Sequence, residues 1–364
     1  MPSTPPVTFF IHGRAEGWEG GRAHGLARSL NPETTRFRFR EPSKLGTAIS
    51  WMREASADPD RVLYVLNTAL PGAILAPWWS LVQRRRYILD TGDAVYEMAR
   101  EAGVDATWRH PFMWAIEQAA HRNARAIVVR GTRHRELLRS RGLRRVEVIR
   151  DGYAEQAGSS PAAVEALRRR LGIGNEFILG VMGSTVWSPR LQICYGWDLL
   201  EALVHIKDLP VRGLVIGDGN GLPWLRRRAA ALGVSDRVLF TGRVPYAEVP
   251  TYLRLMDAAM STQTNNIPGR VRTTGKLPEY MAAERFILAS RVGEAALMLP
   301  ELMLLDFEGT VDRGYPRRVA DRVRLLVQKP ELQELRRSLP NTVRELCDYT
   351  VLSQHLKRLL ETLP

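Results

Sequence analysis

Short apolar runs recur along the first half of the chain, separated by stretches whose apolar residues return at helical spacing. The runs cover residues 7–11, 62–66, 87–89, 126–129 and 146–149. Continuous apolar runs of this length are typical of strands buried in a parallel sheet, and strands alternating with helices indicate a βαβ organisation. The first half is therefore predicted to form an α/β domain.

The second half repeats the pattern, with apolar runs at residues 177–182, 211–216, 238–244 and 286–289. A helix is predicted from about Trp197 to His205, and the chain after Pro316 has the apolar spacing of helices. A length of 364 residues suits two domains. We predict an N-terminal domain at 1–160, a second domain at 161–345 and a closing helix at 346–364, with a linker-like turn at 158–161.

One segment resembles a membrane span, because residues 62–83 contain no charged side chain. Asn67, Thr68, Pro71 and Pro77 interrupt it. It is predicted to be a strand, a loop and a partly buried helix.

The chain is strongly basic, with 52 Lys and Arg against 39 Asp and Glu and a net charge of +13, which favours anionic partners. Arginines are frequent at residues 130–145, and Arg84-Arg85-Arg86 is a further basic run. These arginines form either a solvated helix face or a patch that contacts anionic lipid. Nucleic-acid binding is not expected, since residues 130–145 contain no aromatic side chain. Two cysteines and no signal peptide at the N-terminus predict a cytoplasmic location, with the inner face of the plasma membrane as a possible docking surface.

A candidate anion site lies in the Pro- and Gly-containing segment 267–284, predicted to be a loop followed by a short helix. The loop carries Arg270, Arg272 and Thr274, and the helix would place Lys276 and Glu279 on one face, about one turn apart. A cation and helix amides suit a diphosphate, and a carboxylate suits vicinal ribose hydroxyls. A surface salt bridge between Lys276 and Glu279 is the alternative.

The run KLPEYMAA at 276–283, followed by FILAS at 286–290, resembles the donor-binding segment of GT-B glycosyltransferases, in particular the GT4 family of retaining enzymes. The resemblance implies two Rossmann-like domains facing across a cleft, with a last helix that crosses back to the first domain. It also implies a nucleotide-diphosphate sugar as donor, most simply a UDP- or GDP-sugar, with no other cofactor. Glu279 matches the family's second glutamate, the ribose ligand. The first glutamate of the family falls eight positions earlier, where this chain has Val271.

The same resemblance assigns further donor contacts. Gly20 and Gly21 match a Gly-Gly loop after the first strand, and Arg190 is the nearest cation to the family's Arg/Lys pair, whose lysine position is Tyr195. Asp58-Pro59-Asp60 has the spelling of a metal-binding Asp-x-Asp but precedes a strand, so it is read as a turn and no metal is expected. The full set of predicted donor-binding residues is Gly20, Gly21, Gly183, Ser184, Arg190, Val244, Arg270, Arg272, Thr274, Lys276, Leu277 and Glu279.

Two residues are candidates for the acceptor side. Asp93 follows a predicted strand and could deprotonate an acceptor hydroxyl, or it could cap a helix; His110 is a loop candidate, with a structural histidine as the alternative. The expected function is metal-independent glycosyl transfer to a glycan or glycolipid hydroxyl, in synthesis of a bacterial surface glycan, lipid-linked glycan or glycoconjugate. Retention follows from the resemblance, and inversion with Asp93 as base is the alternative. A further alternative is a weakened sugar-nucleotide-binding or scaffold protein.

Overall fold

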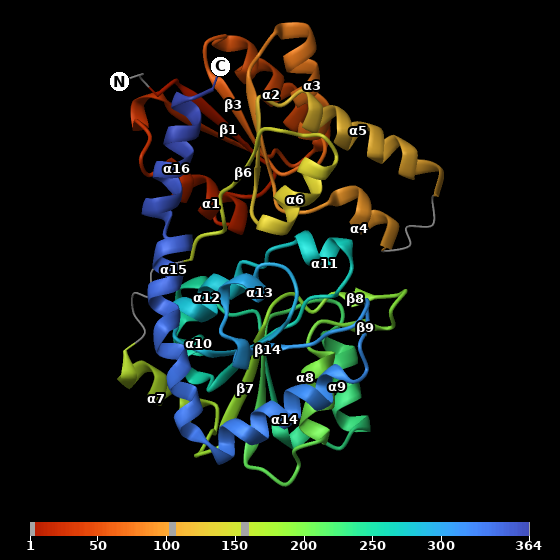
Figure 1. The fold of residues 1–364 in the computed structure, drawn as a ribbon, viewed down its shortest axis with the longest axis vertical. Helices are drawn as coiled ribbons and strands as arrows, with labels where there is room; N and C mark the ends of the chain where they lie inside the picture. Colours follow the sequence, from red (N-terminus) through yellow and green to blue (C-terminus); the bar gives the residue numbers. More distant parts are fainter. Residues whose placement is uncertain (1–3, 102–106, 154–159, 364) are drawn as a thin grey trace. The chain divides into compact units, whose positions relative to one another are not determined.

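The computed structural model describes residues 4–101, 107–153 and 160–363. The chain divides into two compact units (Figure 1), the first formed by residues 1–152, 270–273 and 345–364 and the second by 153–269 and 274–344. The predicted boundary at residue 160 and the Gly158-Ser159 part of its linker lie at or outside the described residues. Each unit is built on its own sheet.

The first unit contains a parallel six-stranded sheet with the order β2-β1-β3-β4-β5-β6. Its strands are β1 (Val7–Ile11), β2 (Thr35–Phe39), β3 (Val62–Leu66), β4 (Tyr87–Thr91), β5 (Ala126–Val129) and β6 (Val146–Val148). The order changes direction between β1 and β3, as in flavodoxin-like folds. The five predicted strands are confirmed, and β2 was not predicted.

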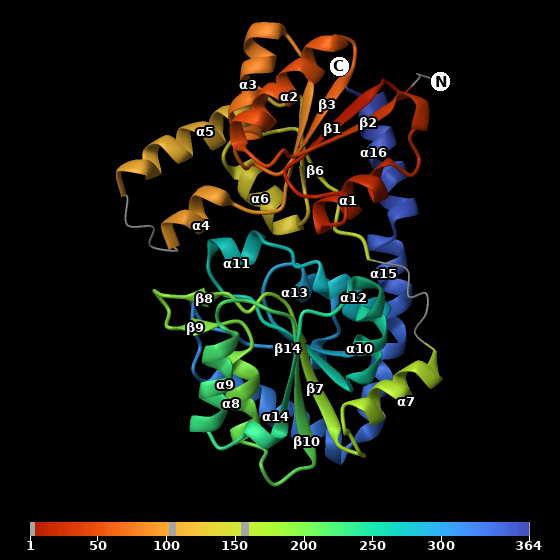
Figure 2. The ribbon, with the colours of Figure 1, turned by 180° about the vertical axis from the view of Figure 1, so that it is seen from behind.

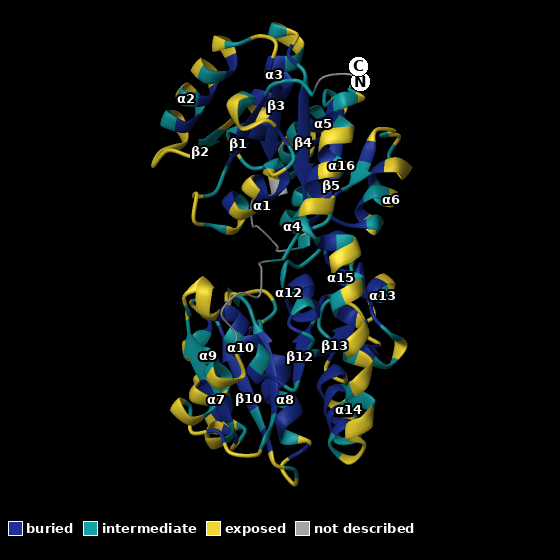
Figure 3. Cartoon of the chain, turned by 90° about the vertical axis from the view of Figure 1, so that its left-hand side faces the viewer, coloured by how far each residue is buried: buried dark blue, intermediate teal, exposed yellow. Residues whose placement is uncertain are grey.

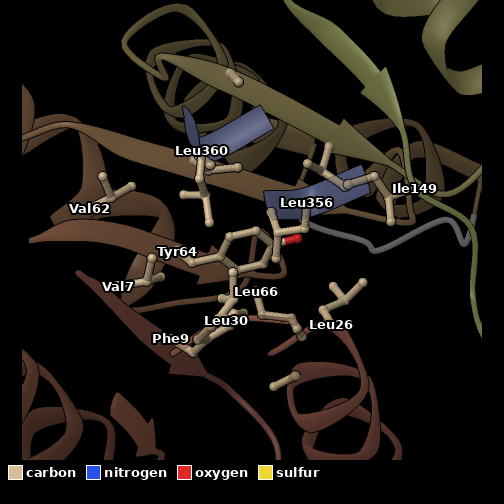
Figure 4. Close-up of a cluster of buried hydrophobic side chains, with 14 of the residues drawn as sticks. Val7, Phe9, Leu26, Leu30, Val62, Tyr64, Leu66, Ile149, Leu356 and Leu360 are labelled. Atoms are coloured by element: carbon tan, nitrogen blue, oxygen red, sulfur yellow. The ribbon is translucent and has the colours of Figure 1, made fainter. Parts of the chain in front are cut away.

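Helices cover both faces of this sheet. On one face α1 (Trp18–Ala27) and α16 (Tyr349–Glu361) pack against Phe9 and Tyr64, as Figure 4 shows for the labelled side chains. On the other face lie α2 (Lys44–Ala57), α3 (Gly72–Gln83) and α5 (His110–Arg122), which pack against Phe10 and Leu63. The remaining helices of this unit are α4 (Val95–Glu101) and α6 (Thr132–Ser140).

A buried network of charges lies where β4, β5 and β6 end. Arg22, on α1, contacts Asp90 Oδ2 at 2.9 Å and Asp151 Oδ1 at 3.2 Å, and donates to the carbonyl oxygens of Ile149 and Arg150. Arg130 Nε lies 3.6 Å from Asp90 Oδ1 and 3.5 Å from Asp151 Oδ1. The two arginines balance the two aspartates, so the network is neutral in charge when all four are ionised.

The second unit also contains a parallel six-stranded sheet, with the order β11-β10-β7-β12-β13-β14. Figure 2 labels β7, β10 and β14 of this sheet. Its strands are β7 (Phe177–Met182), β10 (Val211–Ile216), β11 (Val238–Gly242), β12 (Ala258–Ser261), β13 (Phe286–Ser290) and β14 (Leu304–Leu305). Counted within the unit, this is the 3-2-1-4-5-6 order of dinucleotide-binding domains, which changes direction between β7 and β12.

Short and long helices connect these strands. They are α7 (Pro161–Arg170), α8 (Trp197–Val204), α9 (Leu222–Ala231), α10 (Val249–Leu255), α12 (Lys276–Ala282), α13 (Ala295–Met298) and α14 (Tyr315–Gln328). Helices α11 (Ile267–Val271) and α15 (Leu339–Cys347) each contain residues of both units. An antiparallel hairpin, β8 (Trp187–Ser188) and β9 (Ile193–Cys194), follows β7.

Segment 62–83 folds as predicted, into a strand, a loop and helix α3. Figure 3 shows that α3 presents one buried and one exposed side, consistent with buried Ala76 and Trp79 beside exposed Ile74 and Leu81. Among the described residues, no helix combines the length and the apolar character that a bilayer crossing needs.

Candidate functional site

Helix α12 is fixed to the point where the second sheet changes direction. The buried Tyr280 accepts a hydrogen bond through its hydroxyl from Met182 N, the last residue of β7, at 2.8 Å. Open α/β sheets bind ligands outside the carboxyl ends of their strands at such a switch point. The anchor therefore holds the polar residues of α12 at the edge where a ligand is expected.

Lys276 opens α12 and stacks on an aromatic ring. Its Nζ lies 3.5 Å from the centroid of Tyr195, whose hydroxyl donates to Met260 O on β12 at 3.4 Å. A Cβ on Gly183 would come within 3.0 Å of the Tyr195 ring and 3.2 Å of Lys276 Nζ. Glycine at 183 thus lets the turn after β7 pass close to the ammonium group.

Glu279 lies one turn further along α12 and is buried, with 7% of its surface exposed. Its Oε1 accepts a hydrogen bond from the Tyr246 hydroxyl at 3.0 Å. Because Glu279 is buried, an ion pair between it and Lys276 would not be a surface one. The carboxylate and the exposed Tyr246 ring together form a polar and aromatic border beside the helix.

A second buried carboxyl group lies close enough to sense Lys276. Asp198, on α8, accepts a hydrogen bond from Thr262 Oγ1 at 2.5 Å and from Leu199 N at 3.1 Å. Burial raises the pKa of Asp198, while these hydrogen bonds and the charge of Lys276 oppose the shift. Asp198 and Thr262 were not predicted as site residues, because neither stands in a recognisable sequence motif.

The glycine turns after β7 and β10 interlock beside this site. Gly217 has φ of +131°, and a Cβ there would come within 2.0 Å of Gly183 O. Thr185 N donates to Asp218 O at 3.1 Å, and a Cβ on Gly219 would reach the Thr185 carbonyl carbon at 2.6 Å. These glycines are required for packing of the two loops against each other.

The other donor-binding candidates of the second unit differ in exposure. Ser184 is exposed, and Val244 is half-buried just beyond β11. Arg190 is exposed in the turn of the β8–β9 hairpin. Thr274 O accepts a hydrogen bond from Leu277 N at 3.0 Å, and Leu277 is buried.

Gly20 and Gly21 do not form the predicted loop; both lie inside α1, in its first turns. A Cβ on Gly20 would come within 2.1 Å of Ala15 O, whereas Gly21 has open space around it. The helix begins earlier than predicted because Trp18 and Glu19 already take helical geometry after Gly17, the N-cap residue. A glycine is needed at position 20 because the residue packs against the loop that precedes α1, at Ala15.

The predicted loop at 267–275 is also partly helical, since α11 spans Ile267–Val271. The side chain of Asn266 accepts a hydrogen bond from Gly269 N at 2.9 Å, as an N-cap does. Asn266 before Ile267-Pro268 is the signal that could have predicted this helix. Val271, at the position of the family's first glutamate, is buried.

In the first unit, two candidates contact each other. Arg272 Nε lies 3.1 Å from Asp93 Oδ1, with 53% of the arginine side chain exposed, and Arg270 is exposed. Helix α4 begins at Val95 and Ala94 O accepts from Met98 N, so Ala94 takes the N-cap position that was the alternative for Asp93. The Asp93 carboxylate therefore pairs with the Arg272 guanidinium in this structure.

His110 is the first residue of α5 and lies edge-on to Tyr96, with ring centroids 6.5 Å apart. Its Nε2 is buried and has no hydrogen-bond partner among residues 4–101, 107–153 and 160–363. No group of three or more His, Cys, Asp or Glu side chains suited to a metal is found in those same ranges. Pro59 and Asp60 form a turn, as predicted for the Asp-x-Asp sequence before β3.

Known proteins resemble this chain in sequence over part of its length. Residues 177–328 match the family model of glycosyl transferases group 1. A stretch of 194 residues, 51% of this chain, is 27% identical to a 2-deoxystreptamine glucosyltransferase of Streptomyces kanamyceticus, and the match spans about half, 47%, of that relative's length.

Solved structures of similar fold extend over the whole chain. The Anabaena protein HepE, solved in complex with UDP and glucose, has a TM-score of 0.76 and 16% identity, covering 99% of this chain and 100% of its own. Sucrose-phosphate synthase from Thermosynechococcus elongatus has a TM-score of 0.71 and 15% identity, covering 98% of each chain.

The fold is therefore that of the GT-B class, which confirms the predicted α/β architecture of two Rossmann-like sheets. Residues 177–328, somewhat less than half of the chain, resemble the glycosyl transferases group 1 family in sequence. The narrower GT4 assignment stays a prediction.

Proposed function

We propose that this chain transfers a sugar from a nucleotide-diphosphate sugar to a hydroxyl acceptor. The observation that carries the proposal is the placement of Lys276 and Glu279 at the switch point, fixed there by the hydrogen bond from Met182 N to Tyr280. Lys276 would neutralise the diphosphate and Glu279 would accept from the ribose hydroxyls. The UDP and glucose in HepE support a UDP-sugar as the first donor to test.

The leaving diphosphate would be stabilised without a metal ion. In this proposal Lys276 and the Ser184 amide, in the turn after β7, supply the positive potential, because preorganised donors are effective where charge develops. Arg270 and Arg272 would add to it from their own segment. A donor assay with and without EDTA separates this route from a metal-dependent one.

One observation favours a second candidate, a sugar-nucleotide-binding protein with weakened catalysis. Val271 is buried, so an apolar side chain replaces the carboxylate that the resemblance places beside the transferred sugar. If transfer does occur, the missing carboxylate leaves the anomeric outcome between retention and inversion with Asp93 as base. Product analysis by NMR of the anomeric proton decides between the two outcomes.

The binding experiment is a thermal-shift screen of the full chain against UDP-, GDP-, ADP- and CMP-sugars, because a ligand that binds only the folded state raises the melting temperature. We expect a rise with one of them that Lys276→Ala abolishes. Lys329→Ala, which removes an exposed lysine of the same unit, is the matched control. A rise that Lys276→Ala leaves intact refutes the site. Binding without turnover, with crude membranes as acceptor source, favours the second candidate.

We further propose that the first unit contacts anionic lipid, and that its acceptor is a glycan or glycolipid at that surface. Helix α3 exposes Ile74, Trp78, Leu81 and Val82 at helical spacing, and Arg84 follows at its end. An exposed apolar stripe bordered by basic residues is the pattern of interfacial helices. Arg130 and Arg141 do not belong to such a patch, since the first is buried and the second pairs with Glu97 at 2.7 Å.

Vesicle sedimentation tests this contact. Leu81→Glu should reduce binding to phosphatidylcholine vesicles that contain phosphatidylglycerol, because it places a charge of the wrong sign in the apolar stripe. Leu335→Glu, an exposed leucine of the second unit, is the control. Equal sedimentation of both variants and the parent rejects the α3 surface.

A further inference from the structure

The first unit contains a basic cavity of about 470 Å³ away from the carboxyl ends of its strands. The cavity lies where β5 and β6 begin, between the end of α5 and the turn that follows α6. All strands of this sheet are parallel, so the cavity lies at their amino ends. Asp90 and Asp151 lie at the carboxyl ends of the strands, on the other side of the sheet's length. The cavity is therefore separate from any acceptor site at those ends.

Arginines dominate the charge of the cavity. Its polar lining consists of His121, Arg122, Arg141, Arg144 and Arg145, and the described lining includes no carboxylate. Arg141 pairs with Glu97 at 2.7 Å. Arg122, Arg144 and Arg145 take part in no ion pair in the described ranges 4–101, 107–153 and 160–363.

The ends of α5 and α6 reduce this positive charge only in part. Both helices terminate at the cavity, and a helix C-terminus carries roughly half a negative charge. Two such ends offset about one of the three unpaired arginines, and an excess of about two positive charges remains. The three arginines are exposed, so their excess charge is available to an anion that enters the cavity.

His121 gives a second, independent sign of a ligand. The side chain is 2% exposed, and neither ring nitrogen has a hydrogen-bond partner within the part of the chain that the structure describes. Buried polar atoms are normally satisfied, by protein, water or ligand. Burial, with a smaller effect of Arg141, lowers the pKa of His121 to about 4, so the neutral ring has one N–H to donate at neutral pH.

We propose that this cavity binds a phosphate group carried by a larger molecule. Guanidinium forks recognise phosphate oxygens through paired charge-assisted hydrogen bonds, and His121 adds a neutral donor from the inner wall. The volume lies within the range of about 300–1,000 Å³ found for small-molecule sites, so it accommodates more than a bare phosphate. The phosphate belongs either to a soluble phosphate ester or to a phospholipid headgroup.

The test uses the full chain and two probes. Calorimetric titration with glycerol 3-phosphate measures the soluble source, and flotation with phosphatidylcholine vesicles, with and without phosphatidylglycerol, measures the lipid source. The variant is Arg144→Gln/Arg145→Gln. Its matched control, Arg53→Gln/Arg133→Gln, removes the same charge from exposed positions of the same unit.

We expect the Arg144/Arg145 variant to bind at least one probe tenfold or more weakly than the parent, while the control stays within twofold. Loss toward glycerol 3-phosphate identifies a soluble ester, and loss toward the vesicles alone identifies a headgroup. Equal loss in both double variants would mean general charge attraction and overturns the proposal, as does absence of binding by the parent. Lys276→Ala should retain this binding, so failure of the donor site leaves the cavity test unaffected.

Discussion

Replacement of Arg22 by methionine should strongly destabilise the first unit. The guanidinium is fully buried, contacts Asp90 and Asp151, and donates to the carbonyl oxygens of Ile149 and Arg150. Methionine fits a similar volume but donates no hydrogen bond. Within the described part of the chain, the carboxylate of the fully buried Asp90 would keep the Tyr64 hydroxyl at 2.6 Å and the more distant Arg130.

The expected magnitude follows from the unpaired charge. Removal of one partner from a buried ion pair costs about 3–5 kcal/mol, because the other charge remains out of water. For a unit of this size, 1 kcal/mol shifts the melting temperature by roughly 2–4 °C, so a fall of roughly 6–20 °C is expected. The pair itself contributes less than this, since the cost of desolvating both groups offsets most of their attraction.

Urea unfolding measures the loss, and hydrogen exchange locates it. Peptides of β4 and β5 should lose protection in Arg22→Met, while peptides of β7 and β12 should not change. Arg28→Met, a change at the turn after the same helix, should cost less than about 1 kcal/mol. The double variant Arg22→Met/Asp90→Asn should recover part of the loss. A change below about 1 kcal/mol in Arg22→Met would refute the reasoning.

Other predictions concern buried histidines and the glycines of α1. Burial lowers the pKa of His121 to about 4 and of His134 to about 3, so the folded state binds fewer protons than the unfolded one below pH 6.5. Stability should therefore fall by about 1.4 kcal/mol per histidine per pH unit between pH 6.5 and 4, and His134→Leu should lower the slope of unfolding free energy against pH by that amount. Gly20→Ala should lower the melting temperature and Gly21→Ala should raise it, because the first Cβ meets Ala15 O and the second meets open space. If Gly21→Ala instead weakens donor binding, the diphosphate contact predicted for the Gly-Gly pair is supported.

The sequence predicted the fold where strands are apolar and continuous. It missed β12, whose residues Ala258–Ser261 have low strand propensity and are held by pairing with β7 and β13 on either side. It also missed β2, an edge strand in which Arg36 and Arg38 alternate with Phe37 and Phe39. The alternation was a usable signal, whereas β12 depends on its neighbours.

The polar supports of the site were less predictable than its ligand-facing residues. Lys276 and Glu279 stand in a motif, but Tyr195 and Asp198 contact α12 or its surroundings only through the tertiary fold. The same holds for Arg22 and Asp90, which lie 68 residues apart. That a charged residue is buried can be predicted only when the position of its partner in the fold is known.

The protonation of Asp198 decides how much of the Lys276 charge is available to a diphosphate. Tyr195 contacts the ammonium group of Lys276 through the face of its ring. Burial raises the pKa of Asp198, which favours its neutral form. Asp198→Asn keeps an oxygen for the Thr262 hydrogen bond and removes the titration. If the carboxyl is already neutral, donor affinity at pH 7 should change less than threefold, measured by calorimetry. A tenfold or larger gain in donor affinity would mean that an ionised Asp198 neutralises Lys276. The main role of the lysine charge would then be to stabilise the fold.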